Sequence, residues 1–196
     1  MDRAGKVIDY LDHLLPNGTI LDVGAGNGFT AQKLTHFQRK IVALEPAGGM
    51  IDRQVSLPWA QGVAQELPFK ANSFSGAYAT WAYFFPTYNE YGTLGLKEIH
   101  RVVMPDHPLV IVDNAGGDEF CSLFERDLSS DSSWWQAQGF ERHIVNTHFH
   151  FDSFGEAEEL LSFYWNHNGR TAGHKIKLKY EYRVAVYRRN SVDQLF

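Results

Sequence analysis

Three glycines at alternate positions are the first feature of the sequence that indicates a ligand-binding turn. Gly24, Gly26 and Gly28 follow directly on the mostly apolar run "TILDV". Because glycine has no Cβ, such a turn lets a ligand approach the backbone, and the N–H groups behind it can bind polar atoms. Glu45 follows about 20 positions further on, where a carboxylate accepts hydrogen bonds from both hydroxyls of a ribose. The spacing predicts a site for a ligand that contains a ribose.

A nicotinamide dinucleotide would require a different spacing of the glycines. Its pyrophosphate sits on a helix N-terminus behind G-x-G-x-x-G. Here the spacing is G-x-G-x-G, and Phe29 occupies the position of the last required glycine. A nicotinamide-dependent oxidoreductase is therefore only a minor alternative.

Alternating strands and helices are predicted to position this turn. Apolar periodicity indicates βα units, which form a parallel sheet with helices on both faces. Ligands bind such sheets beyond the carboxyl ends of the strands. The predicted strands cover residues 19–23, 40–45, 59–63, 74–80 and 109–114, and the predicted helices cover 29–37, 49–55 and 89–103.

The last third of the chain has a different pattern. Residues 141–151 and 175–189 alternate between polar and apolar side chains, which is typical of antiparallel strands at a sheet edge. Helical material is predicted over 119–138 and over 155–166, with Ser153 as a cap of the second helix.

The chain is expected to form a single domain over residues 1–196. It would comprise an amphipathic N-terminal helix (1–16), a cofactor-binding half (19–114) and a C-terminal half with an antiparallel sheet edge (115–189).

Composition excludes several classes of function. The net charge is −5, with 18 basic and 23 acidic side chains. The sequence has no extended basic stripe of the kind that binds nucleic acid. One cysteine, Cys121, fits a reducing compartment. No apolar run approaches the roughly 20 residues that cross a bilayer. We expect a cytoplasmic protein with no membrane span and no nucleic-acid partner, and the sequence leaves its oligomeric state open.

Four motifs in order resemble a known family. "LDVGAGNG" and "ALEPAGGM" are similar to the first two motifs of the class I S-adenosylmethionine-dependent methyltransferases. "GVAQELPFKANSFSGAYAT" resembles the segment with the adenine contact and the fourth strand, and "LKEIHRVVMPDHPLVIVD" resembles the helix, turn and fifth strand that follow. The resemblance is strongest to small-molecule enzymes such as those of ubiquinone and menaquinone biosynthesis. It implies an α/β fold: a Rossmann-like three-layer sandwich whose seven-stranded, mostly parallel sheet has its last strand antiparallel, beside the fifth.

The resemblance also implies S-adenosylmethionine as cofactor, with roles for several residues. Asp22 would steady the glycine turn near the methionine amino group, and Gly24 and Gly26 would pack against the cofactor. Glu45 would hold the ribose, and Met50 would cover the adenine.

The remaining implied contacts follow the third and fourth strands. Ala64 would offer its N–H to the adenine next to Gln65, although Val63 stands where the family often has an aspartate. Thr80 and Trp81 would flank the methionine portion and the reacting methyl. The full implied set of cofactor-binding residues is Asp22, Gly24, Ala25, Gly26, Glu45, Pro46, Met50, Ala64, Gln65, Thr80 and Trp81.

The implied reaction is an in-line displacement on a sulfonium, which is already activated and needs no metal. Positioning then supplies much of the rate enhancement. An uncharged aromatic run follows the fourth strand, which favours a small, largely apolar or aromatic acceptor. The candidate acceptor-binding residues are Trp81, Tyr83, Phe84, Tyr88, His148 and His150.

Some candidates have a purely structural alternative. His148 and His150 alternate on one strand, as a base or metal pair would, but also as a half-exposed strand pair would. No metal site is predicted. Trp134 and Trp135 would either cap the acceptor or pack a loop onto the sheet. For the whole chain, the main alternative is a non-catalytic relative that keeps the fold to bind a partner or a metabolite.

Overall fold

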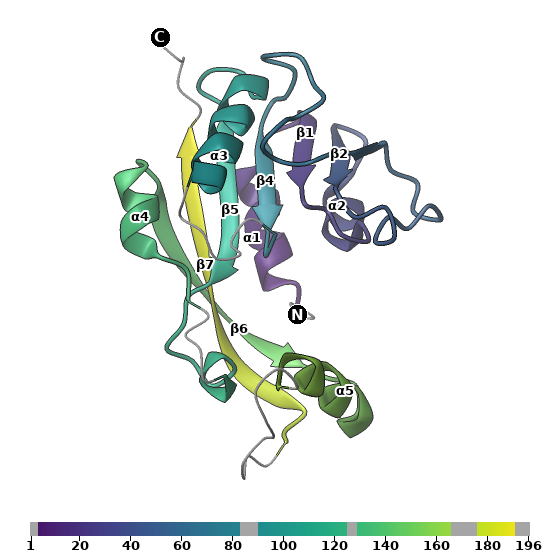
Figure 1. Ribbon diagram of the computed structural model, residues 1–196, viewed down its shortest axis with the longest axis vertical. Coiled ribbons are helices and arrows are strands. Elements are labelled where there is room, and N and C mark those ends of the chain that lie inside the picture. The colour runs from purple at the N-terminus through teal and green to yellow at the C-terminus, as the bar shows by residue number, and fades with distance from the viewer. Residues whose placement is uncertain (1–3, 83–89, 125–128, 166–175, 191–196) are drawn as a thin grey trace.

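The computed structural model describes residues 4–82, 90–124, 129–165 and 176–190. Seven strands form one sheet in the order β3-β2-β1-β4-β5-β7-β6 (Figure 1). Strands β3, β2, β1, β4 and β5 are parallel to one another, whereas β7 is antiparallel to both β5 and β6. The predicted fold, with the last strand inserted beside the fifth, is confirmed. The strands are β1 (Gly18–Val23), β2 (Arg39–Glu45), β3 (Trp59–Gln61), β4 (Ala77–Thr80), β5 (Pro108–Asn114), β6 (Glu141–His150) and β7 (Lys179–Asn190).

Helices cover both faces of this sheet. Alternate residues of the strands enter one of two cores, one with α1, α2 and α5, the other with α3 and α4. Figure 1 shows α3 in front of β4 and β5, and α1 behind them. The molecule is thus the expected three-layer sandwich. The helices are α1 (Lys6–Leu14), α2 (Phe29–Leu34), α3 (Glu90–Val102), the 3-10 helix η1 (Cys121–Leu123), α4 (Ser132–Ala137) and α5 (Phe154–Trp165).

Strands β6 and β7 continue beyond the other five strands and form an extension with α5 (Figure 1). The last pair between β5 and β7 is Asn114 with Val184, so residues 179–183 of β7 lie past the end of β5. The segment after β5 covers this free edge: Arg183 N–H and Glu181 N–H donate to the carboxylates of Asp118 and Glu119. The core of the extension is aromatic and contains Phe120, Phe149, Phe151, Tyr180 and Tyr182.

One sequence-based prediction of helix was wrong, and a second was confirmed in part. Residues 49–55 form turns instead, because Gly48 and Gly49 weaken a helix and Asp52 Oδ1 accepts the N–H of Gln54 in a local turn. In the predicted 119–138 segment, the described residues contain only η1 and α4. Asp131 caps α4 by accepting hydrogen bonds from the N–H groups of Ser133 and Trp134, so a separate helix begins after it. The predicted Ser153 cap of α5 is confirmed by its bond from Glu156 N–H.

Arg39, buried within the sandwich, joins α1 and α2 to the start of β2. Its guanidinium pairs with Asp12 at 2.5 Å. It also donates to four carbonyl oxygens at the ends of the two helices, those of Asp12, Leu15, Pro16 and Leu34. Carbonyls at a helix C-terminus lack hydrogen-bond donors within the helix. Arg39 provides these donors from a neighbouring strand.

Candidate functional site

The carboxyl ends of four adjacent strands bring most of the predicted site residues to one edge of the sheet. Asp22 lies near the end of β1, Glu45 ends β2, and Thr80 ends β4. Ala64 and Gln65 lie in the turn after β3. Because β3, β2, β1 and β4 are neighbours in one parallel arrangement, these ends form a continuous edge, where open α/β sheets bind ligands.

The glycine turn after β1 depends on left-handed backbone. Gly24, Gly26 and Gly28 have φ values of 76°, 57° and 83°, which residues with a Cβ rarely adopt. The N–H groups of Gly24 and Ala25 both donate to the carbonyl of Leu44, at 2.9 Å. These bonds attach the turn to the end of β2.

Glu45 completes this attachment with its side chain. One carboxylate oxygen accepts the N–H of Gly26 at 2.8 Å, and the other accepts the N–H of Ala47 at 2.9 Å. The residue is only 7% exposed. Each carboxylate oxygen can accept more than one hydrogen bond, so both keep acceptor capacity for a pair of hydroxyls. Glu45 therefore both shapes the turn and remains available to a ligand.

Asp22 is a buried carboxylate with one unused oxygen. The Tyr78 hydroxyl donates to Oδ2 at 2.8 Å, whereas Oδ1 has no hydrogen-bond partner among the described residues. Burial raises the pKa of Asp22 to about 7, the bond from Tyr78 opposes this shift, and the charge of Glu45 adds to it. A buried acceptor without a partner is costly, so a cationic group beside Oδ1 would be bound favourably.

The shifted Asp22 makes stability depend on pH in a defined direction. A pKa raised from 3.8 to about 7 in the folded state means that the folded chain binds this proton more tightly than the unfolded chain does. The contribution of protonated Asp22 to the free energy of unfolding is therefore fully present below pH 3.8. It is lost as the pH rises towards about 7. We expect the stability gained on Asp22→Asn, relative to wild type, to grow over this window. Urea unfolding of both proteins at several pH values measures it; a difference independent of pH would contradict the buried, protonatable state.

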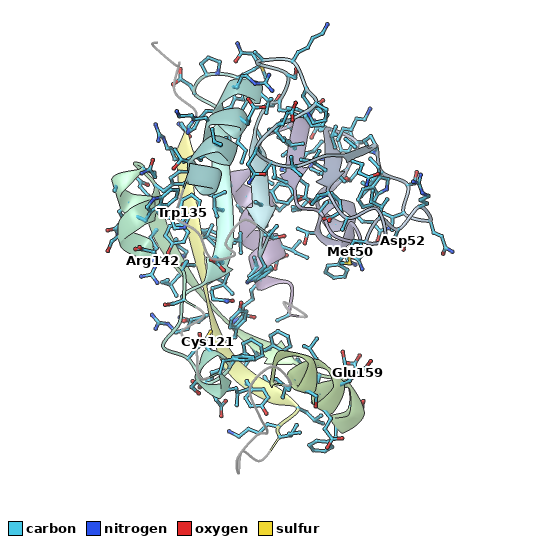
Figure 2. All side chains as sticks on the ribbon, viewed as in Figure 1. Met50, Asp52, Cys121, Trp135, Arg142 and Glu159 are labelled. Carbon is cyan, nitrogen blue, oxygen red and sulfur yellow. The ribbon has the colours of Figure 1, made fainter. Side chains whose placement is uncertain are left out.

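Other residues implied in cofactor binding surround the turn. Met50 lies on the loop after β2 (Figure 2). It is 54% exposed, and its Cε would lie 3.9 Å from a Cβ built on Gly26. The Pro46 carbonyl accepts from the Gln61 side chain at 3.2 Å. The exposed thioether thus stands over the open side of Gly26, as covering an adenine would require.

Trp81, directly after β4, is held by contacts that the sequence did not predict. Its backbone is left-handed, with φ of 48°. Its indole N–H donates to the Tyr182 hydroxyl at 2.7 Å, and this hydroxyl donates in turn to Asn114 Oδ1. Burial raises the Tyr182 pKa well above its ordinary value, so the hydroxyl keeps its proton and remains a donor. No short-range pattern links positions so far apart in the chain, and sequence reasoning missed Tyr182 and Asn114.

Several candidates are not brought to this edge. His148 and His150 lie on the face of β6 opposite to Phe149, which is in the core that contains Tyr78 and Tyr182. Trp135 is buried in the other core, against Phe140 and Tyr187, so the tryptophan pair packs α4 onto the sheet (Figure 2). The predicted acceptor residues Tyr83, Phe84 and Tyr88 lie outside the described residues.

The described part of the chain contains neither a cluster of metal ligands nor a helix suited to a bilayer. No group of three His, Cys, Asp or Glu side chains is arranged as a metal site would be. None of the helices there combines the length and apolar character needed to cross a membrane.

Known proteins resemble this chain in sequence and in fold. Residues 21–111 match a family model described as a methyltransferase domain. The biotin biosynthesis bifunctional protein BioHC of Cellvibrio japonicus is 31% identical over 111 residues, which is 52% of this chain and 21% of that protein. The chain thus spans about a fifth of the length of this curated relative.

Solved structures share the fold over nearly the whole chain. A SAM-dependent methyltransferase from Thermotoga maritima matches with a TM-score of 0.60 and 18% identity, covering 95% of this chain and 87% of that one. The [4+2]-cyclase SpnF matches with a TM-score of 0.60 and 16% identity, covering 95% and 81%. Residues 21–111 thus match a methyltransferase domain, and the chain shares its fold with S-adenosylmethionine-dependent methyltransferases.

The described residues fit S-adenosylmethionine as a ligand. The open side of Gly26 leaves room at the backbone, Glu45 retains acceptor capacity for a ribose, and the unused Asp22 oxygen suits a cationic amino group. The residues that would hold the cofactor are therefore those at the ends of β1 and β2.

Proposed function

We propose that this chain transfers the methyl group of S-adenosylmethionine to a small, largely apolar or aromatic acceptor. The observation that carries the proposal is the glycine turn closed by Glu45, whose carboxylate joins Gly26 and Ala47 while keeping capacity for a ribose. The same edge of the sheet contains Asp22, with a buried oxygen to which no described residue donates a hydrogen bond.

The bound cofactor would supply a methyl group already activated on a sulfonium. The chain then has to orient its two substrates and exclude water, and such positioning can contribute roughly 7 kcal/mol or more to a barrier. Glu45 would bind the ribose, Asp22 would bind the amino group, and Trp81 at the end of β4 would face the reacting end. A general base is required only where the acceptor carries a proton that must leave.

Two features support a small, uncharged acceptor. The run from Trp81 to Phe85 contains no charged side chain, and the net charge of −5 does not attract polyanions. Incubation with methyl-labelled cofactor and a panel of small acceptors tests this part. Transfer confined to nucleic acids or to proteins would contradict it.

The role of Glu45 is tested by binding alone. We expect Glu45→Ala to weaken the binding of S-adenosylhomocysteine by about 1.5–3 kcal/mol, because a hydrogen bond to a charged acceptor is lost. Glu66→Ala removes an exposed carboxylate after β3 and serves as a control that should bind normally. Titration calorimetry on folded variants measures both. Equal affinities of wild type and Glu45→Ala for S-adenosylhomocysteine would contradict the role of Glu45 in binding the ribose.

A second function remains open because the fold supports other chemistry. The [4+2]-cyclase SpnF has the same fold, so a chain of this kind can serve a reaction that is named for ring closure rather than methyl transfer. Under this alternative, or for a non-catalytic binding protein, the cofactor would bind but no acceptor would gain a methyl group. The labelled-transfer assay therefore distinguishes these readings from the proposed function.

A further inference from the structure

Trp81 adopts a backbone conformation that has to be stabilised by its surroundings. Its φ of 48° is uncommon for any residue with a Cβ and is costly for a bulky one. Conformations of this kind persist where surrounding contacts enforce them, often at functional sites. Trp81 lies at the end of β4, on the edge that also presents Glu45 and Asp22.

A chain of hydrogen bonds holds this residue from β5 and β7. The Trp81 N–H donates to the Val112 carbonyl at 2.9 Å, which ties its backbone to β5. Its indole N–H donates to Tyr182 on β7, and Tyr182 donates to Asn114 at the end of β5. Main chain and side chain of Trp81 are thus fixed separately.

The turn at Trp81 also contacts the glycine turn. A Cβ built on Gly24 would lie 2.3 Å from the Cβ of Ala82, so Ala82 packs directly on the backbone of Gly24. A change in the Trp81 conformation would displace Ala82 and disturb the turn that Glu45 closes. Tyr182 is 1% exposed and packs against Phe120 and Phe149 of the extension, so its hydroxyl is a fixed point.

We propose that Tyr182 is a positioning residue for the proposed methyl transfer, acting through the Trp81 turn on the cofactor site. Its hydroxyl, oriented by Asn114, holds the Trp81 indole, and the resulting turn packs Ala82 on Gly24. The inference rests on the proposed function. Tyr182 itself need not touch either substrate.

Tyr182→Phe tests this role, because it keeps the ring and removes only the hydroxyl. Tyr187→Phe is a matched control on the same strand: it removes a buried hydroxyl bonded to Ser130 at 2.7 Å, in the opposite core. We expect Tyr182→Phe to weaken S-adenosylhomocysteine binding about two- to tenfold, as for one lost hydrogen bond, and Tyr187→Phe to bind as wild type does. Melting temperatures of both variants show that each is folded.

A second measurement needs no ligand. In protein labelled with ¹⁵N-tryptophan, five indole N–H signals are expected, and Trp81→Phe assigns the one from Trp81. Tyr182→Phe should move that signal and speed its hydrogen exchange, while Tyr187→Phe should leave it in place. The signal reports directly whether the Trp81 indole depends on the Tyr182 hydroxyl.

The outcomes distinguish a failure of the proposed function from a failure of the positioning role of Tyr182. Failure of wild type to bind S-adenosylhomocysteine would overturn the proposed function and this inference with it. Normal wild-type binding with undiminished binding by Tyr182→Phe, or an equal loss in Tyr187→Phe, would overturn the positioning role alone. A Trp81 signal that is unmoved in Tyr182→Phe would also overturn it, because the indole would then not depend on the hydroxyl.

Discussion

Replacing Gly24 by alanine should lower the free energy of unfolding by about 2–5 kcal/mol and abolish cofactor binding. A residue with a Cβ pays about 1–2 kcal/mol in the left-handed region, and Gly24 has φ of 76°. The new Cβ would also lie 2.3 Å from that of Ala82, and overpacking of this kind costs about 1–3 kcal/mol. Urea unfolding and a titration with S-adenosylhomocysteine measure the two effects.

Two variants separate the causes of this effect. Gly49→Ala is a control, because a Cβ there meets no atom within 4 Å and the backbone is not left-handed. In the double variant Gly24→Ala with Ala82→Gly, the steric part should be relieved while the left-handed strain remains, so stability should recover in part. A Gly24→Ala protein as stable as Gly49→Ala would contradict the packing of the two turns.

Replacing Arg39 by alanine should destabilise the fold by about 2–4 kcal/mol, because the buried carbonyl oxygens of Leu15 and Leu34 lose their donor. The change would leave Asp12 without its cation and four carbonyl oxygens without their donor. Thermal and urea unfolding measure the loss.

Neighbouring substitutions give the controls for Arg39. Lys40→Ala removes an exposed cation from the next position of β2 and should change stability by no more than about 0.5 kcal/mol. Arg39→Lys keeps the charge but not the planar fork of donors, so it should recover only part of the loss. Equal stability of Arg39→Ala and Lys40→Ala would show that the two helix ends do not depend on Arg39.

The sequence predicted those parts of the fold whose causes are local or periodic. The strand–helix alternation and the apolar runs from β1 to β5 gave the parallel sheet, and the alternation in β6 and β7 gave its antiparallel edge. The helix predicted over 49–55 failed because a single turn bond from Asp52 outweighs weak apolar periodicity. The role of Arg39 was not predictable, since its partners lie 23 to 27 positions away, with the exception of Leu34.

For the candidate site, the sequence indicated the residues at the strand ends but not their interactions. Asp22, Glu45 and Thr80 lie at the expected edge because each is at or near the end of a predicted strand. That Tyr78 would bond Asp22, and Tyr182 would bond Trp81, depends on strand order and on which face each side chain enters. The same limit applies to His148 and His150, whose alternation was evident but whose face of the sheet was not.

The central claim is that the glycine turn and Glu45 bind S-adenosylmethionine, and titration calorimetry of the purified chain tests it most directly. We predict saturable binding of S-adenosylhomocysteine to one site, displaced by S-adenosylmethionine and unaffected by a nicotinamide dinucleotide. Binding of the dinucleotide in preference to S-adenosylhomocysteine, or no binding of either sulfur compound by the folded chain, would contradict the account.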